Sequence, residues 1–131
     1  MKNLNWKAEV HPCFDQAFLF LGITMAPPTD IRLVHAVIEP PGLGRSAHAW
    51  VENLKDDTAV LGQDEGRHTL YATMDRIAFR EKVKILYDVA YTPERAVQMA
   101  RTHQSFGPWD DRILEFMTDS AELPKSREAT G

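Results

Sequence analysis

The sequence has little cysteine and little basic charge. Cys13 is the only cysteine in 131 residues, so the chain cannot close an internal disulfide. This predicts a reducing compartment, or a thiol kept for its chemistry. Fifteen Lys and Arg stand against nineteen Asp and Glu, which gives a net charge of −4 without a basic cluster. Because phosphate binding needs a dense basic surface, we expect no nucleic acid partner.

Long apolar runs are also absent. The longest, residues 17–25, is far shorter than the roughly 20 residues that span a bilayer. No basic leader precedes it, and Pro27 and Pro28 follow in place of a small-residue cleavage site. We therefore expect no membrane partner and a cytoplasmic location.

What the chain does have is an ordinary globular composition. Apolar residues make up 44% and charged residues 26%, which suits one packed core and excludes disordered and collagen-like chains. The length fits one domain. We expect a single α+β domain over residues 1–118 and a flexible tail over residues 119–131, where hydrophobic periodicity ends.

Hydrophobic periodicity predicts a helix, a run of strands, and then helices around one more strand. The predicted helices cover residues 12–22, 67–79, 93–103 and 110–117, and the predicted strands cover residues 31–39, 48–53, 58–62 and 82–91. Residues 31–39 are apolar on both alternating faces, as in a strand covered on both sides, whereas residues 82–91 alternate as a strand at or near an edge does. This layout predicts an antiparallel sheet with helices packed on one side.

Start signals and apolar spacing support two of these helices. Pro12 suits a first helical position, and Phe14 begins a core-facing stripe in that helix. Thr92 is an expected N-cap, and we expect the helix that follows it to bury three small or branched residues, namely Ala96, Val97 and Ala100.

Two residues of complementary chemistry stand 35 positions apart. Cys13 falls in the first turn of the first predicted helix, where free N–H groups and the helix dipole favour the nucleophilic thiolate. His48 opens the second predicted strand and would serve as the base. A third group must orient the imidazole from the far end of the neighbouring strand. Asp64 is the first choice and Gln63 the second, while Asp57 lies in the preceding turn and is a poorer geometric candidate.

At these residues the chain resembles the papain-like fold, in particular its transglutaminase-like branch. In that branch a cysteine begins a buried helix, and a histidine opens a strand reading His-Ala-Trp-Val-Glu, which residues 48–52 match without a gap. The apolar strand 31–39 between them matches the small leader-peptidase domains of lasso-peptide maturation. The resemblance covers residues 12–64. It implies a cysteine-dependent hydrolase or acyltransferase that cleaves or transfers a peptide or amide bond through a Cys-His-Asp-type triad of Cys13, His48 and Asp64.

The chain departs from this family at the third catalytic position. Where the family has Asp followed by Pro or Ser, residues 61–65 read Leu-Gly-Gln-Asp-Glu. The backbone N–H of Cys13 is one expected oxyanion donor, and a second donor is not assigned. A non-catalytic module of the same fold, which binds a peptide or protein, is therefore the alternative interpretation.

Three further residues are expected to contact a peptide or protein substrate. Trp50 shares a strand face with His48, where it would shield the base from water, pack in the sheet, or both. Gly44 and Arg45 belong to the loop that leads to the histidine, and loops at strand ends often carry binding residues.

No metal or other cofactor is predicted. Cys13, His35 and His48 lack the short-spaced ligand pairs of structural zinc sites, and His35 lies mid-strand, as a core histidine does. The sequence leaves open whether the reaction would be hydrolysis, deamidation or acyl transfer, and it leaves the oligomeric state open.

Overall fold

The computed structural model describes residues 12–64 and 69–119, which form one sheet flanked by helices. The elements in chain order are α1 (Pro12–Ile23), the short 3-10 helix η2 (Pro28–Asp30), β1 (Ile31–Ile38), β2 (Ser46–Asn53), β3 (Thr58–Asp64), β4 (Thr69–Asp75), α2 (Arg76–Val83), β5 (Ile85–Tyr91), α3 (Pro93–His103) and α4 (Asp111–Asp119). The five strands pair antiparallel in the order β4-β3-β2-β1-β5. The predicted α+β class with an antiparallel sheet is therefore confirmed.

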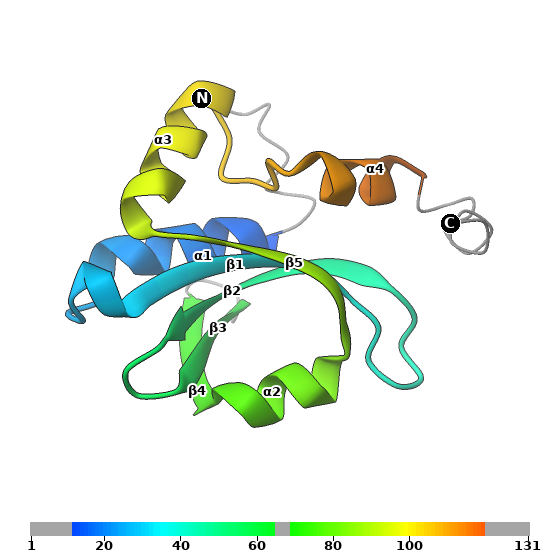
Figure 1. Ribbon diagram of the computed structural model, residues 1–131, viewed down its shortest axis with the longest axis horizontal. Coiled ribbons are helices and arrows are strands. Elements are labelled where there is room, and N and C mark those ends of the chain that lie inside the picture. The colour runs from blue at the N-terminus through cyan, green and yellow to red at the C-terminus, as the bar shows by residue number, and fades with distance from the viewer. Residues whose placement is uncertain (1–11, 65–68, 120–131) are drawn as a thin grey trace.

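Helices cover both faces of the sheet, with α1, α3 and α4 on one side and α2 on the other (Figure 1). One core lies under the first three helices and contains Phe14, Leu33 and Ile113; the other lies under α2 and contains Trp50 and Phe79. The prediction of helices on one side was wrong. Strands β4 and β5 lie at opposite edges, so the chain between them must cross a face of the sheet, and α2 lies in that crossing.

Strand β1 is central and supplies both cores. It pairs with β2 along its whole length and with β5 on its other side. Leu33 and Val37 point towards α1, α3 and α4, while Val34 and Ile38 belong to the core under α2. The prediction that this strand is covered on both sides is confirmed, as is the edge position of β5.

Strands β2 and β3 pair at one end and separate at the other. Their register covers only Val51–Asn53 of β2, whereas β3 pairs with β4 along its whole length. Helix α1 packs beside this fork. A Cβ atom placed on Gly62 of β3 would lie 2.7 Å from Cβ of Gln16, so glycine permits the close approach of α1. The hydroxyl of Tyr71 on β4 also donates to the backbone oxygen of Gln16, at 3.0 Å.

The predicted helix over residues 67–79 was wrong for residues 69–75, which form β4, and right for residues 76–79, which begin α2. Residues 67 and 68 lie outside the described residues. Leu70, Met74 and Ile77 follow helical spacing, yet all three are at least 38% exposed, so they mark no helix core. The true start signal is Asp75, whose carboxylate accepts a hydrogen bond from the backbone N–H of Ala78 at 2.8 Å.

The predicted strand over residues 82–91 begins late, at Ile85. Helix α2 continues to Val83, which is buried beneath it, and Lys84 closes the helix in a left-handed conformation with φ of 51°. The alternating pattern of residues 82–91 therefore extends three residues too far, across a helix end.

Helices α3 and α4 are confirmed as predicted helices. The Thr92 hydroxyl caps α3 by accepting a hydrogen bond from the N–H of Arg95 at 3.1 Å. Ala96 and Ala100 are buried as expected, but Val97 is 38% exposed, because it lies one position around the helix from Ala96. Of the predicted tail, Asp119 ends α4 and the remainder lies outside the described residues. None of the described helices is long and apolar enough to cross a membrane.

Candidate active site

The sulfur of Cys13 lies among backbone N–H groups at the start of α1. Burial raises the pKa of this thiol from 9.0 to about 11, although hydrogen bonds from the backbone of Ala49, Cys13 and Phe14 oppose the rise. The nearby carboxylate of Asp15 raises it further. The thiol is therefore protonated at neutral pH, and a base would have to remove its proton before attack.

His48 precedes Ala49 on β2 and supplies a neutral imidazole. Burial lowers its pKa from 6.5, so the ring is uncharged at pH 7 and able to accept a proton. Cys13 and His48 both keep partial exposure to solvent. Among the described residues, no hydrogen bond joins the Cys13 sulfur to the His48 ring.

Strand alternation decides where the two side chains point. Ala47 and Ala49 belong to the core on the α1 side, so His48 lies on the face that carries Trp50, whose ring centroid is 6.0 Å from that of His48. The N–H of Ala49 that contacts Cys13 points along the plane of the sheet. The described part of β3 pairs with β2 only from Val51 onwards, so no described strand pairs with this edge of β2 beside His48, and we call it the open edge. The cysteine and the histidine thus approach this open edge from opposite faces.

The three candidates for the third catalytic position lie at two different places along β3 and the turn before it. Asp57 lies beyond the other end of β2, and its Oδ1 accepts from Nη2 of Arg76 at 2.8 Å, so it does not face His48. Gln63 and Asp64 lie on the part of β3 that has separated from β2. Gln63 is exposed. The role of the Asp64 side chain stays a prediction.

The three predicted substrate contacts lie in two different settings. Trp50 is fully buried, stacks edge to face on Phe79 with centroids 4.9 Å apart, and so packs in the sheet. Gly44 has a φ of +77° in the exposed loop between β1 and β2. Arg45 ends that loop with its Nε 3.4 Å from Oε2 of Glu39. Contact of these residues with a substrate stays a prediction.

His35 is the second imidazole near α1, and it is a core residue. Its side chain is fully buried among the rings of Phe14, Tyr91 and Trp109, at centroid distances of 4.7, 5.3 and 4.9 Å. Burial lowers its pKa to about 3, and neither ring nitrogen has a hydrogen-bond partner within the described structure. Across residues 12–64 and 69–119, no three His, Cys, Asp or Glu side chains are grouped to hold a metal ion.

Comparisons with protein-family models, with curated proteins and with solved structures gave no match to this chain. The resemblance to the papain-like fold therefore stays a prediction that rests on the sequence of residues 12–64.

Sequence reasoning did not identify Ala49 as part of the site. Its contribution is a backbone N–H group, which every residue except proline carries, so no side-chain pattern could reveal it. The open edge of β2 was missed for a similar reason, because it depends on where β3 leaves β2 and not on residue type.

Proposed function

We propose that the chain is a cysteine-dependent hydrolase or acyltransferase that acts on a peptide or amide bond. The observation that supports it best is the position of the Cys13 sulfur, which accepts a hydrogen bond from the N–H of the residue after His48. Both side chains are partly exposed, whereas the other imidazole near α1, that of His35, is sealed in the core. The accessible thiol and the accessible imidazole therefore share the open edge of β2.

The protonation states suit a general-base mechanism. The neutral imidazole of His48 takes the thiol proton as the sulfur of Cys13 forms a bond to the substrate carbonyl carbon. The resulting imidazolium gives that proton to the leaving amine as the carbon–nitrogen bond breaks, which leaves a thioester on Cys13. Water then releases the acid, or a second amine takes the acyl group.

Two features of the edge favour this chemistry. The backbone N–H groups at the start of α1 can stabilise the oxyanion as well as the sulfur. Because the described part of β3 does not pair with β2 beside His48, a rotation of the His48 side chain would carry the ring around this edge towards the sulfur. Asp64, or Gln63 before it, would hold the ring in the required tautomer.

The test is the pH profile of Cys13 alkylation by iodoacetamide, read by mass spectrometry. Cys13 is the only cysteine, so the label reports one site. If His48 acts as its base, the wild-type rate shows an inflection below pH 7 that His48→Gln removes. His103→Gln, which changes an exposed histidine on α3, is the matched control and keeps the inflection.

The second candidate is a non-catalytic module that binds a peptide or protein. It is favoured by the separation of the Cys13 and His48 side chains onto different faces of β2 and by the position of Asp57, which faces Arg76 instead. Alkylation profiles that are identical in wild type and His48→Gln, with one inflection near pH 11, would contradict the enzyme and support this module.

A further inference from the structure

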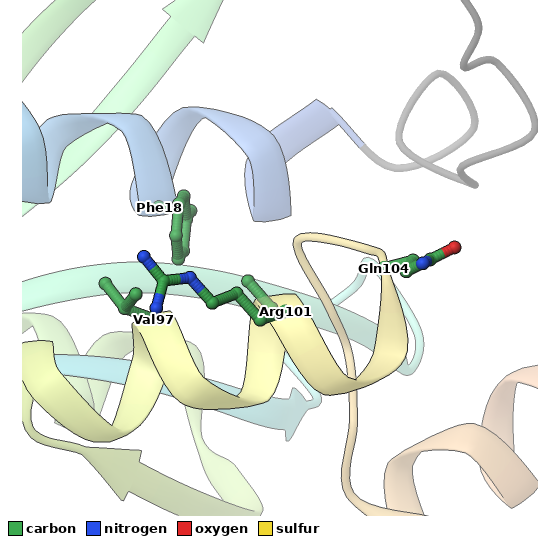
Figure 2. Close-up of a pocket in the computed structure, with 5 residues that line it drawn as sticks. Phe18, Val97, Arg101 and Gln104 are labelled. Carbon is green, nitrogen blue, oxygen red and sulfur yellow. The ribbon is translucent and has the colours of Figure 1, made fainter.

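A groove runs between α1 and α3 on the side of the molecule away from α2. Its cavity has a volume of about 440 Å³ and is lined by Phe18 of α1 and by four residues of α3 and its end, namely Val97, Ala100, Arg101 and Gln104. Figure 2 shows Phe18 pointing from α1 towards α3, with Val97 and Arg101 pointing back. The ring of Phe18 stacks on Phe106 at a centroid distance of 4.8 Å, so the groove has a fixed apolar wall.

The apolar surface continues outwards along α1. Leu19 is 53% exposed and Ile23 is 62% exposed, although a helix with so few polar residues is usually covered on all sides. Gly22 lies one turn after Phe18 on the same side of α1, and a Cβ atom built there meets nothing within 4 Å. The backbone of another chain can therefore approach α1 closely at this position.

The groove is lined by one charged side chain, that of Arg101, in a chain whose net charge is −4. Arg101 stands at the groove without a hydrogen bond or ion pair to any described residue. Gln104 adds an amide at the end of α3. An occupant of this surface must therefore combine apolar side chains for the groove with a carboxylate for Arg101.

We propose that the groove docks an acidic amphipathic helix of a partner protein. Phe18 of α1 and Val97 of α3 line the same cavity, so a third helix can place a ridge of residues spaced by three and four positions over it. Apolar residues of that ridge would pack on Phe18 and Val97, and an acidic residue on its flank would pair with Arg101. The proposal does not depend on the chemistry of Cys13.

The experiment uses two synthetic helical peptides of about 15 residues. Both carry one leucine stripe, flanked by glutamates in one peptide and by lysines in the other. Binding is measured by fluorescence anisotropy of the labelled peptide against the full chain, and the site is located from backbone amide NMR shifts. We expect saturable binding of the glutamate peptide, with shifts confined to α1 and α3.

Charge-reversal variants distinguish binding at this groove from nonspecific binding. Arg101→Glu is expected to weaken binding of the glutamate peptide by about tenfold or more and to strengthen binding of the lysine peptide. Lys82→Glu makes the same charge change on α2, across the sheet, and is expected to leave both affinities unchanged. Val97→Ser removes apolar surface without adding a charge and is expected to weaken both peptides, while Cys13→Ser changes neither.

Several results would overturn the proposal. One is that the two peptides bind with equal affinity and that Arg101→Glu changes neither affinity. Another is a set of NMR shifts centred on the exposed Leu70, Met74 and Ile77 instead of the groove. Saturable binding of laurate, used as a second probe, without binding of the glutamate peptide would assign the groove to a fatty acid. If the wild-type alkylation profile has no inflection below pH 7 but the glutamate peptide binds, the proposed enzyme activity is contradicted and the docking site is supported.

Discussion

His35 shows how one buried side chain can make stability depend on pH. The folded protein holds this imidazole neutral, because burial lowers its pKa to about 3, while Asp110 opposes that shift. The unfolded chain binds a proton near pH 6.5. Below pH 6.5 the unfolded state therefore carries more protons than the folded state, and stability falls as the pH falls towards 3.

We predict that the free energy of unfolding drops by about 2 kcal/mol between pH 7 and pH 5 through His35 alone. Urea unfolding followed by circular dichroism at several pH values measures it. His35→Leu is expected to remove most of this dependence. His48, whose pKa is lowered by burial as well, adds to the slope in the same direction.

The matched control is His103→Gln, which alters an exposed histidine and should keep the wild-type slope. A slope that is the same in wild type and His35→Leu would show that His35 is not held neutral in the folded protein.

The imidazole of His35 leaves no room for a side chain at Gly107. The φ of this glycine is +109°, and a Cβ atom there would lie 2.4 Å from Cε1 of His35. Gly107→Ala is therefore expected to destabilise the fold by roughly 3 kcal/mol or more, from backbone strain and overlap together.

A substitution at Gly42 measures the backbone strain without the overlap with His35. Gly42 also has a positive φ, of +79°, but a Cβ atom there meets nothing within 4 Å. Gly42→Ala should cost only about 1–2 kcal/mol. Equal losses of stability in Gly107→Ala and Gly42→Ala would show that the contact with His35 relaxes freely.

At the scale of elements, Glu52 fastens α2 to the sheet. Its carboxylate is 97% buried and accepts hydrogen bonds from the indole of Trp50 at 2.9 Å and from Nε of Arg80 at 2.8 Å. Arg76 lies 3.7 Å away on the same helix, and Arg80 also reaches Asp88 on β5 at 3.2 Å. The last residue of the His-Ala-Trp-Val-Glu motif therefore has a structural role.

We predict that Glu52→Gln destabilises the protein by about 2 kcal/mol. Loss of one member of a buried ion pair costs about 3–5 kcal/mol, and the partial exposure of both arginines reduces that figure. Asp57→Asn is the matched control, because it removes an exposed carboxylate that also pairs with Arg76. It should cost less than about 1 kcal/mol in the same urea titration. Equal costs would contradict the anchoring role of Glu52.

Local signals predicted the elements that carry their own caps and periodicity. Pro12 marked the start of α1, and Thr92 followed by proline marked the start of α3, because cap geometry depends on residues close in sequence. The boundary between β4 and α2 was missed because the spacing of Leu70, Met74 and Ile77 imitates a helix face. Only tertiary packing shows that these residues are exposed and that Phe79 and Val83 are the buried ones.

The candidate site was predicted in its residue types but not in its geometry. Spacing and motif selected Cys13 and His48, yet a sequence cannot tell that β3 separates from β2 beside the histidine. At that fork Gln16 packs against Gly62, and these two residues are 46 positions apart. Contacts between distant positions of this kind leave no local pattern.

At the scale of the whole molecule, two cores share one sheet. Strand β1 supplies Val34 to the core under α2 and Val37 to the core under α1, α3 and α4. If one core unfolded alone, β1 would lose its pairing with β2 and β5, and the other core needs the same pairing. We therefore expect the two cores to unfold as one cooperative unit.

The indole N–H signals of Trp50 and Trp109 report the two cores separately, since each side chain is buried on a different face. In a urea series followed by NMR, we predict that both native signals disappear at one midpoint. Val34→Ala and Val37→Ala, truncations on opposite faces, should each cost roughly 1–3 kcal/mol and lower both midpoints together. If Val34→Ala lowered only the Trp50 midpoint, the core under α2 would be an independent unit, and the central position of β1 would not couple the two faces.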